Sequence, residues 1–247
     1  MSGVAIVTGG ARGIGWAVGK HLRDEGWQVV AVDVVPGETE AGETGIDYRE
    51  MDVCDREQVS ATFAAVVEEH GGLDLLVNNA GITRHRPLVD LTWEDWSAVV
   101  DVNLNGVFNC LQAAGRIMIE RGSGVILNMA SVAAERGAAG RAPYATTKAA
   151  IVGLTRSAAV EWAPFGLRVN AVGPGYVDAG VLSAAIAAGT LDPADVLQRI
   201  PAGRLADPDE IGAMVSFLAS PDAAYVNGQV FYVDGGFLAD YGVNVKR

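Results

Sequence analysis

The chain has 247 residues, of which half are hydrophobic and 19% are charged, which suits one large α/β domain and argues against disorder. The formal net charge of −12 argues against nucleic acid and anionic membrane surfaces as partners, because both require basic patches. Cys54 and Cys110 form no disulfide framework or metal site of recognisable spacing, and the histidines are scattered, so a reduced, cytoplasmic protein without a metal is expected. The first residues do not resemble a signal peptide, and no apolar run approaches the roughly 18 residues of a membrane span.

The first predicted strand, Val4–Thr8, runs directly into a glycine-rich turn. Helical character follows from Trp16 to Glu25. Strand, glycine turn and helix together are typical of a site where backbone N–H groups at a helix N-terminus bind a pyrophosphate. The candidate residues of this turn are Gly9, Arg12, Gly13, Ile14 and Gly15.

The second predicted strand, residues 28–33, ends on Asp33, which lies 18 residues beyond Gly15. A carboxylate near this distance is expected to bind the ribose hydroxyls of the adenosine. Its charge repels a 2′-phosphate, and Val34 brings no compensating cation, so NAD is favoured. Arg12 in the glycine turn supports the alternative, NADP.

Further strand tips carry polar or small residues. After a strand at 48–51, Asp52 and the backbone of Val53 are candidates for contact with adenine. A helix capped by Asp55 is predicted to run to about His70, and the next strand, 73–77, leads to Asn79, Ala80 and Gly81 as a cofactor floor. Thr92 is expected to cap a single long helix over about 93–120. Asn103 falls inside that helix beside a glycine, a locally unfavourable choice that tends to mark function.

The strongest candidate for chemistry follows the strand at 125–130. Ser131 stands at its carboxyl end, where ligands bind in open α/β sheets, and a helix is predicted over 142–162. Tyr144 and Lys148 are four residues apart in that helix, so both side chains share one face. An ammonium about 4 Å away at an effective dielectric of about 20 supplies roughly 4 kcal/mol. This is about the free energy needed to lower a tyrosine pKa from about 10 to near neutrality, where a proton donor and acceptor works best.

The strand at 167–172 leads to Pro174, Gly175 and Val177. Residues 178–206, rich in alanine and broken by glycine and proline, are predicted to form a substrate lid with short helices. A helix opening at Pro208 and a strand at 230–233 complete the chain. Alternating strands and helices predict a Rossmann-type, doubly wound parallel sheet in one domain.

These motifs, in this order, resemble the short-chain dehydrogenase/reductase family along the whole chain. The motifs are Thr8-Gly9-x-x-x-Gly13-Ile14-Gly15, Asn78-Asn79-Ala80-Gly81, Asn103, Ser131, Tyr144-x-x-x-Lys148 and Pro174-Gly175. The resemblance implies that Tyr144 exchanges a proton with the substrate oxygen, that Ser131 orients that oxygen and that Lys148 binds the nicotinamide ribose and lowers the tyrosine pKa. It implies that Asn103 holds a water in a proton relay, and that the hydride is exchanged at the Pro174 loop. It also implies a homotetramer with the helices of Asn103 and Tyr144 at an interface.

One position departs from the family. Members commonly carry threonine a few residues after the Pro-Gly pair, where its hydroxyl meets the nicotinamide carboxamide, but this chain has Ala179. Backbone groups near Val177 are therefore expected to make that contact.

The function favoured by these patterns is an NAD-dependent dehydrogenase of a secondary alcohol, acting on a small alcohol or ketone. One alternative is an NADPH-dependent 3-oxoacyl-(acyl-carrier-protein) reductase, against which stand the acidic composition and Phe165, at a position where such reductases resemble one another in having arginine. The other is a nucleotide-sensing protein without turnover, which complete retention of Ser131, Tyr144 and Lys148 opposes.

Small apolar positions predict a modest aliphatic or cyclic substrate, whereas Arg84, His85, Arg86 and Arg136 are candidates for holding a carboxylate or polyol. The apolar positions are Val132, Ala133, Ala134, Val177, Val181 and Leu182.

Overall fold

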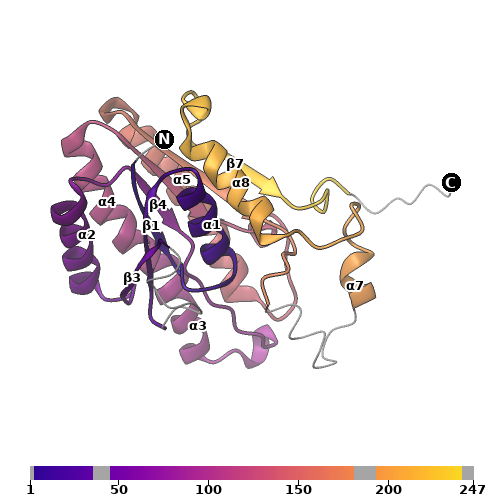
Figure 1. The fold of residues 1–247 in the computed structure, drawn as a ribbon. Helices are drawn as coiled ribbons and strands as arrows, with labels where there is room; N and C mark the ends of the chain where they lie inside the picture. Colours follow the sequence, from indigo (N-terminus) through magenta and orange to yellow (C-terminus); the bar gives the residue numbers. More distant parts are fainter. Residues whose placement is uncertain (1–2, 36–44, 181–192, 241–247) are drawn as a thin grey trace.

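The computed structural model describes residues 3–35, 45–180 and 193–240, and its centre is one sheet (Figure 1). The strands are β1 (Val4–Thr8), β2 (Gln28–Asp33), β3 (Asp47–Glu50), β4 (Leu75–Asn78), β5 (Gly124–Met129), β6 (Leu167–Pro174) and β7 (Val230–Val233). They form a seven-stranded sheet in the order β3-β2-β1-β4-β5-β6-β7, and every adjacent pair is parallel. The predicted α/β fold is therefore confirmed.

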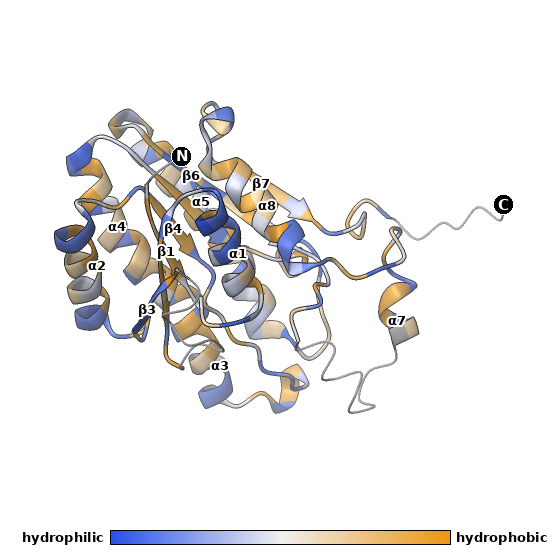
Figure 2. Ribbon diagram, viewed as in Figure 1, coloured by the Kyte–Doolittle hydropathy of each residue, from blue (hydrophilic) through white to orange (hydrophobic). Residues whose placement is uncertain are grey.

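Helices cover both faces of this sheet. They are α1 (Gly13–Asp24), α2 (Arg56–His70), α3 (Trp93–Val100), α4 (Val107–Arg121), α5 (Ala142–Trp162), α7 (Pro193–Leu197) and α8 (Pro208–Ala219). Helices α1 and α8 pack together over one face, while α2, α4 and α5 cover the other (Figure 1). Figure 2 shows the central strands in the colours of apolar residues between these two layers. Because the strands are buried on both faces, they consist of nearly continuous apolar runs rather than alternating ones.

The strand order places the site. From β1 to β3 the strands are added on one side of β1, and from β4 to β7 they are added on its other side. The strand order therefore reverses between β1 and β4, which are neighbours in the sheet. All carboxyl ends lie along one edge of a parallel sheet, and ligands bind in the crevice that opens there. Asp33 and Pro174 end their strands, and the glycine turn, Asn79 and Ser131 follow theirs, so the predicted residues gather at this edge.

The predicted single helix over 93–120 is interrupted. A π-helical turn at Asp101–Gly106 separates α3 from α4, and Asn103 lies within it. The Asn103 side chain is fully buried and binds the backbone of Ile82 in both directions, accepting its N–H at 2.8 Å and donating to its carbonyl at 2.9 Å. These hydrogen bonds join Asn103 to a residue 21 positions away and accompany the wider π-helical turn. A helical sequence pattern does not reveal such a turn.

Other boundaries are close to those expected. Helix α5 spans the predicted residues, and Asp55 and Thr92 accept backbone N–H groups as helix caps. Helix α1 begins at Gly13, three residues before the expected start, because the glycine turn itself enters the helix. Strand β4 begins at Leu75 rather than residue 73, and the side chain of Asp74, just before it, accepts the backbone N–H of Val4.

Part of the predicted lid over 178–206 lies outside the described residues, including Val181 and Leu182. The described parts contain the short helix α7 and a parallel bridge between Val177 and Ala206. The bridge joins the two ends of the segment beside the carboxyl end of β6. In the described part of the chain, no helix combines the length and apolar character needed to cross a membrane.

Candidate active site

The turn after β1 has the shape that a dinucleotide pyrophosphate requires. Gly9 has φ +63°, and a Cβ there would lie 2.8 Å from the Ala80 Cα. A Cβ on Gly15 would lie 2.1 Å from the Gly9 carbonyl oxygen, so both positions require glycine. Arg12, which is exposed at the start of α1, makes no side-chain cap, so the first backbone N–H groups of this helix have no such partner. Uncapped N–H groups beside a tight glycine turn fit an anionic phosphate.

The floor of this crevice is held by hydrogen bonds between the tips of β1 and β4. The Thr8 hydroxyl accepts the N–H groups of Asn79 and Ala80, each at 3.0 Å. The Asn79 amide donates to the carbonyls of Thr8 and Gly9 at 2.9 and 3.0 Å. Asn79 therefore fixes the glycine turn from below. The next residue, Gly81, approaches Asn103, whose Oδ1 would lie 3.3 Å from a Cβ at that glycine.

Asp33 lies at the tip of β2, beside the same turn. Its two carboxylate oxygens accept the N–H of Ala11 at 3.3 Å and of Val34 at 2.8 Å. These bonds orient the carboxylate next to the start of α1. The sequence predicted this placement from spacing alone, and the structure brings Asp33 and the glycine turn together.

The outer candidates are arranged around this centre. Asp52 accepts the N–H of Cys54 at 2.8 Å in the turn after β3, and the carbonyl of Val53 accepts the Asn109 amide at 3.0 Å. At the other side, Gly175 approaches Asp234 so closely that a Cβ would lie 2.8 Å from its Cα. Gly175 directly follows Pro174, the last residue of β6, and precedes the bridge at Val177. All of these positions follow carboxyl ends of strands, as predicted.

Ser131 and Tyr144 meet beyond the end of β5. Ser131 is 8% exposed, and its hydroxyl accepts the N–H of Ala133 at 3.2 Å. Tyr144, in the first turn of α5, is half-buried and hydrogen-bonds with the Ser131 side chain. The two hydroxyls are therefore adjacent, so one substrate oxygen can contact both.

Lys148 lies one turn further along α5. Its Nζ is 5.6 Å from the centroid of the Tyr144 ring and donates to the carbonyl of Met129 at 2.6 Å. The side chain is buried, and burial lowers the pKa of Lys148 to about 8. The Tyr144 phenol and the Lys148 amine are thus neighbours, as predicted.

The expected depression of the Tyr144 pKa by Lys148 is wrong. Burial raises the pKa of Tyr144, while the hydrogen bond with Ser131 and the charge of Arg141 act in the opposite direction. Lys148 donates to the carbonyl of Met129, and its charge is not among the causes of the shift in the Tyr144 pKa. Tyr144 is therefore a neutral phenol at neutral pH and is ready to donate a proton.

Asn103 does not offer a free side chain for water. Its amide binds Ile82 and also donates to the Thr147 hydroxyl at 3.4 Å, next to Lys148. The described contacts make Asn103 a bridge between the loop after β4 and α5. Its predicted part in a proton relay stays a prediction.

The sequence pattern missed Arg141, whose charge acts on the Tyr144 phenol from the N-terminal end of α5. The available signal was its spacing, three residues before Tyr144, which puts both side chains near one face of the first helical turn. A basic residue beside a proline-containing helix start has no motif of its own, so spacing alone could have found it.

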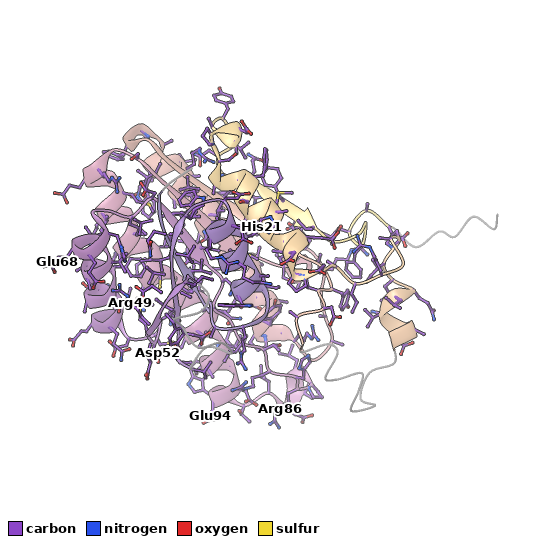
Figure 3. The ribbon with its side chains drawn as sticks, in the orientation of Figure 1. His21, Arg49, Asp52, Glu68, Arg86 and Glu94 are labelled. Atoms are coloured by element: carbon purple, nitrogen blue, oxygen red, sulfur yellow. The ribbon has the colours of Figure 1, made fainter. Side chains whose placement is uncertain are left out.

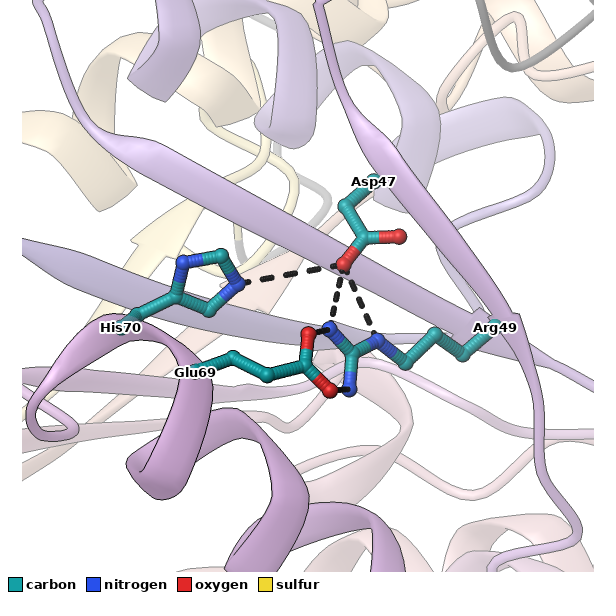
Figure 4. A network of polar contacts seen from close by, with 4 residues as sticks. All are labelled: Asp47, Arg49, Glu69 and His70. Atoms are coloured by element: carbon teal, nitrogen blue, oxygen red, sulfur yellow. Dashed lines mark hydrogen bonds and ion pairs between the residues drawn. The ribbon is translucent and has the colours of Figure 1, made fainter.

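One cluster of potential metal ligands exists among the described residues, and it lies away from this site. It comprises Asp47, Glu69 and His70. Figure 4 shows the guanidinium of Arg49 among them, donating to Asp47 at 2.6 Å and to Glu69 at 2.6 Å. A bidentate cation already neutralises both carboxylates, so the cluster is an ion-pair network rather than a vacant metal site.

Comparisons with known proteins agree with this geometry. A family model described as enoyl-(acyl carrier protein) reductase matches residues 9–238. The chain is 39% identical to the 3-oxoacyl-[acyl-carrier-protein] reductase FabG of Vibrio cholerae, over 94% of this chain and 96% of that protein.

Solved structures give the same result. Levodione reductase superposes with a TM-score of 0.91 at 36% identity, covering 96% of this chain and 98% of the other. A gluconate 5-dehydrogenase from Burkholderia cenocepacia, in complex with NADP and tartrate, gives a TM-score of 0.87 at 35% identity, covering 96% and 95%. The chain belongs to the short-chain dehydrogenase/reductase family of oxidoreductases.

Proposed function

We propose that this chain transfers a hydride between a nicotinamide dinucleotide and a small secondary alcohol or ketone. The observation that carries the proposal is the convergence of Ser131, Tyr144 and Lys148 at the carboxyl edge of the sheet. The bound nicotinamide supplies the hydride donor or acceptor. In the direction of reduction, the carbonyl carbon gains the hydride and the carbonyl oxygen gains the proton of the Tyr144 hydroxyl, so that a ketone becomes a secondary alcohol. Oxidation reverses both transfers.

Each protein group has a separate part in this reaction. Ser131 donates a hydrogen bond to the substrate oxygen and stabilises the negative charge that develops there. Tyr144 holds and moves the proton. Lys148 binds the cofactor ribose, and its hydrogen bond to the Met129 carbonyl holds the amine one helical turn from Tyr144. The residues that would hold the dinucleotide are those of the glycine turn, with Asp33 at the adenosine end and the Pro174 loop at the other.

For the cofactor, we propose NAD. The support is the Asp33 carboxylate, which is fixed beside the glycine turn and followed by Val34, an exposed apolar residue. A 2′-phosphate beside this carboxylate would meet like charge. NADP is the second candidate, supported by exposed Arg12 and by the NADP bound to the gluconate 5-dehydrogenase.

For the substrate, the names of the relatives support a carrier-bound 3-oxoacyl group better than a free secondary alcohol or ketone. The FabG proteins are named as 3-oxoacyl-[acyl-carrier-protein] reductases, and several of them are 39% identical to this chain. Levodione reductase and gluconate 5-dehydrogenase are named for free small molecules. Carrier-bound 3-oxoacyl groups are therefore the second candidate substrate, and free carbonyl compounds are the first because the net charge of −12 repels an acidic carrier.

We also propose a homotetramer. Helix α5 exposes Ala149, Gly153 and Val160 along one stripe, and Phe108 on α4 and Phe165 after α5 are also exposed. Val160 is 79% exposed, which is unusual for a large apolar residue on a long helix. Apolar groups at this spacing suit packing of α5 against a second copy of the chain.

The test is a cofactor-oxidation assay with NADH and NADPH over three kinds of ketone: free neutral ketones, free oxo acids and a 3-oxoacyl group on acyl carrier protein. Turnover of a free ketone with NADH supports the proposal, while turnover only of the carrier-bound substrate with NADPH supports the alternative. Tight dinucleotide binding without turnover of any substrate would instead indicate a nucleotide-sensing protein.

A further inference from the structure

A hydrogen-bonded pair, Arg141 and His85, stands beside the catalytic phenol. Arg141 precedes the first residue of α5, and its Nε donates to Nε2 of His85 at 2.5 Å. The backbone joins the same two loops, since the N–H of Arg86 donates to the Gly140 carbonyl at 2.9 Å. The loop after β4 and the loop before α5 thus form one wall next to Tyr144.

The other cations of this region are already engaged. Arg84 and Arg86 both contact Asp95 of α3, at 3.7 and 2.9 Å. Figure 3 labels Arg86 among the side chains of the molecule. Arg136 donates to the backbone carbonyls of Leu238 and Asp240, at 3.1 and 2.9 Å. None of these three arginines is therefore a good ligand for a substrate.

Unlike Arg84 and Arg86, Arg141 has no acidic partner among residues 3–35, 45–180 and 193–240. Unlike Arg136, its side chain donates to no backbone carbonyl in those ranges. Burial and the Arg141 charge lower the pKa of His85, so its imidazole is neutral and Nε2 accepts the bond from Arg141. This bond occupies only Nε. The donors on the two terminal nitrogens have no protein partner within those ranges, and their planar fork matches a carboxylate.

We propose that Arg141, oriented by His85, binds a carboxylate of the substrate while the reacting carbon lies at Ser131 and Tyr144. The substrate class is then hydroxy acids and their oxo acids, with the carboxylate a few bonds from the reacting carbon. This inference rests on the proposed function, because it assigns the substrate of the same site.

Charge and geometry both favour an anion over a neutral alcohol. Arg141 lies near enough to Tyr144 for its charge to act on the phenol, so one small molecule can span both groups. A half-buried guanidinium without a carboxylate partner gains more from a charged ligand than from a hydroxyl. A lysine at this position would lack the bidentate fit.

The experiment compares oxo acids with their methyl esters, which keep the carbonyl and remove the charge. The probes are 2-oxobutanoate, 3-oxobutanoate, 4-oxopentanoate and 5-oxohexanoate, each with its ester, and the readout is the ratio of kcat/KM for acid to ester. We expect the wild type to prefer at least one acid by about tenfold or more, since a bidentate charged contact is worth at least that factor. The ratio should fall to within about threefold of unity in Arg141→Gln and lie between the two in Arg141→Lys.

The matched control is Arg86→Gln, which removes the same charge from the same wall but at a side chain held by Asp95. It should keep the wild-type ratio. Equal loss of the ratio in Arg86→Gln and Arg141→Gln would show a general charge effect and overturn the inference. A wild type that prefers no acid over its ester would overturn it as well, while leaving the proposed function intact.

A binding measurement separates this inference from the reaction itself. Calorimetric titration of the protein with the hydroxy acids of the same series, in the presence of dinucleotide, needs no turnover. Binding that is lost in Arg141→Gln but kept in Arg86→Gln supports the carboxylate site even if no ketone is reduced, in which case only the proposed reaction fails. Equal affinity of wild type and Arg141→Gln for every acid overturns the inference.

Discussion

Lys148 and Met129 are joined by a hydrogen bond of 2.6 Å that directs the buried amine at the last carbonyl of β5. The bond fixes Nζ at 5.6 Å from the centroid of the Tyr144 ring, at the edge where the predicted cofactor residues gather. The amine is thus positioned by the sheet and not by a carboxylate, and burial lowers its pKa to about 8. Several consequences of this arrangement can be measured.

Replacing Tyr144 by phenylalanine should abolish turnover. The change removes the only hydroxyl placed to exchange a proton next to Ser131 among the described residues, and proton transfer by a positioned group contributes about 10²- to 10⁴-fold. Binding of the dinucleotide, measured by fluorescence of the reduced cofactor, should stay within about threefold of wild type. A variant that retains more than a tenth of the activity would remove Tyr144 from the mechanism.

The two directions of the reaction should respond oppositely to pH. Burial raises the pKa of Tyr144 above its ordinary value of about 10. Oxidation requires the deprotonated phenol, so its kcat/KM should rise steadily from pH 7 to 10, whereas reduction requires the phenol and should stay level over the same range. Initial rates in both directions, taken in buffers of constant ionic strength, give the two profiles. An oxidation profile that reaches its plateau below pH 8 would show a lowered phenol pKa in the working enzyme.

Lys148→Met should change how stability depends on pH. The pKa of Lys148 is about 8 in the folded chain and 10.5 in the unfolded one, so the unfolded chain binds more protons between these values. The folded protein therefore carries a penalty that is full below pH 8 and is relieved as the pH rises to 10.5, amounting to roughly 3 kcal/mol.

Urea unfolding at pH 7, 8, 9 and 10 should show this rise in the wild type without dinucleotide and not in Lys148→Met. Lys20→Met is the control, because Lys20 is partly exposed on α1 and its replacement should leave the rise unchanged. Parallel curves for the wild type and Lys148→Met would contradict a strongly depressed lysine pKa.

Most of the architecture could be predicted because it follows from local patterns. The buried apolar runs fixed the strands, and α5 matched its predicted limits from Ala142 to Trp162. The π-helical turn could not be predicted, since it accompanies contact between Asn103 and Ile82, which are 21 residues apart. The sequence indicates helical propensity, but it does not indicate a tertiary hydrogen bond such as the one between Asn103 and Ile82.

In the candidate site, too, the sequence predicted which residues are neighbours but not the tertiary contacts that set their properties. Spacing predicted that Tyr144 and Lys148 would be neighbours, but burial and the Met129 carbonyl, which decide the direction of both pKa shifts, belong to the folded chain. The spacing of Arg141 to Tyr144 is visible in the sequence, but its contact with His85, 56 residues away, is not.

Asp33→Ala should weaken the preference for NAD. The carboxylate is held by the N–H groups of Ala11 and Val34 next to the glycine turn. Its proposed role there is to bind the ribose hydroxyls and to repel a 2′-phosphate. We expect the ratio of kcat/KM for NADH to NADPH to fall by about tenfold or more, mainly through a higher KM for NADH. Asp52→Ala, one strand further out, is the comparison and should alter the ratio less. An unchanged ratio in Asp33→Ala would mean that this carboxylate does not select the cofactor.

Gly153→Leu should disrupt assembly without harming the fold. Gly153 is exposed in the middle of α5, and a Cβ there would meet nothing within 4 Å, so nothing in the described chain requires glycine. Leucine is a better helix former by roughly 0.5–1 kcal/mol, and the thermal stability of the isolated subunit should not fall. If α5 packs closely against a second copy of the chain, the larger side chain separates the helices, and sedimentation should show smaller species than in the wild type. The same substitution at Gly137, an exposed loop glycine with equally open surroundings, should leave assembly unchanged. A monomeric wild type, or a Gly153→Leu variant that assembles as the wild type does, would rule out this helix as the interface.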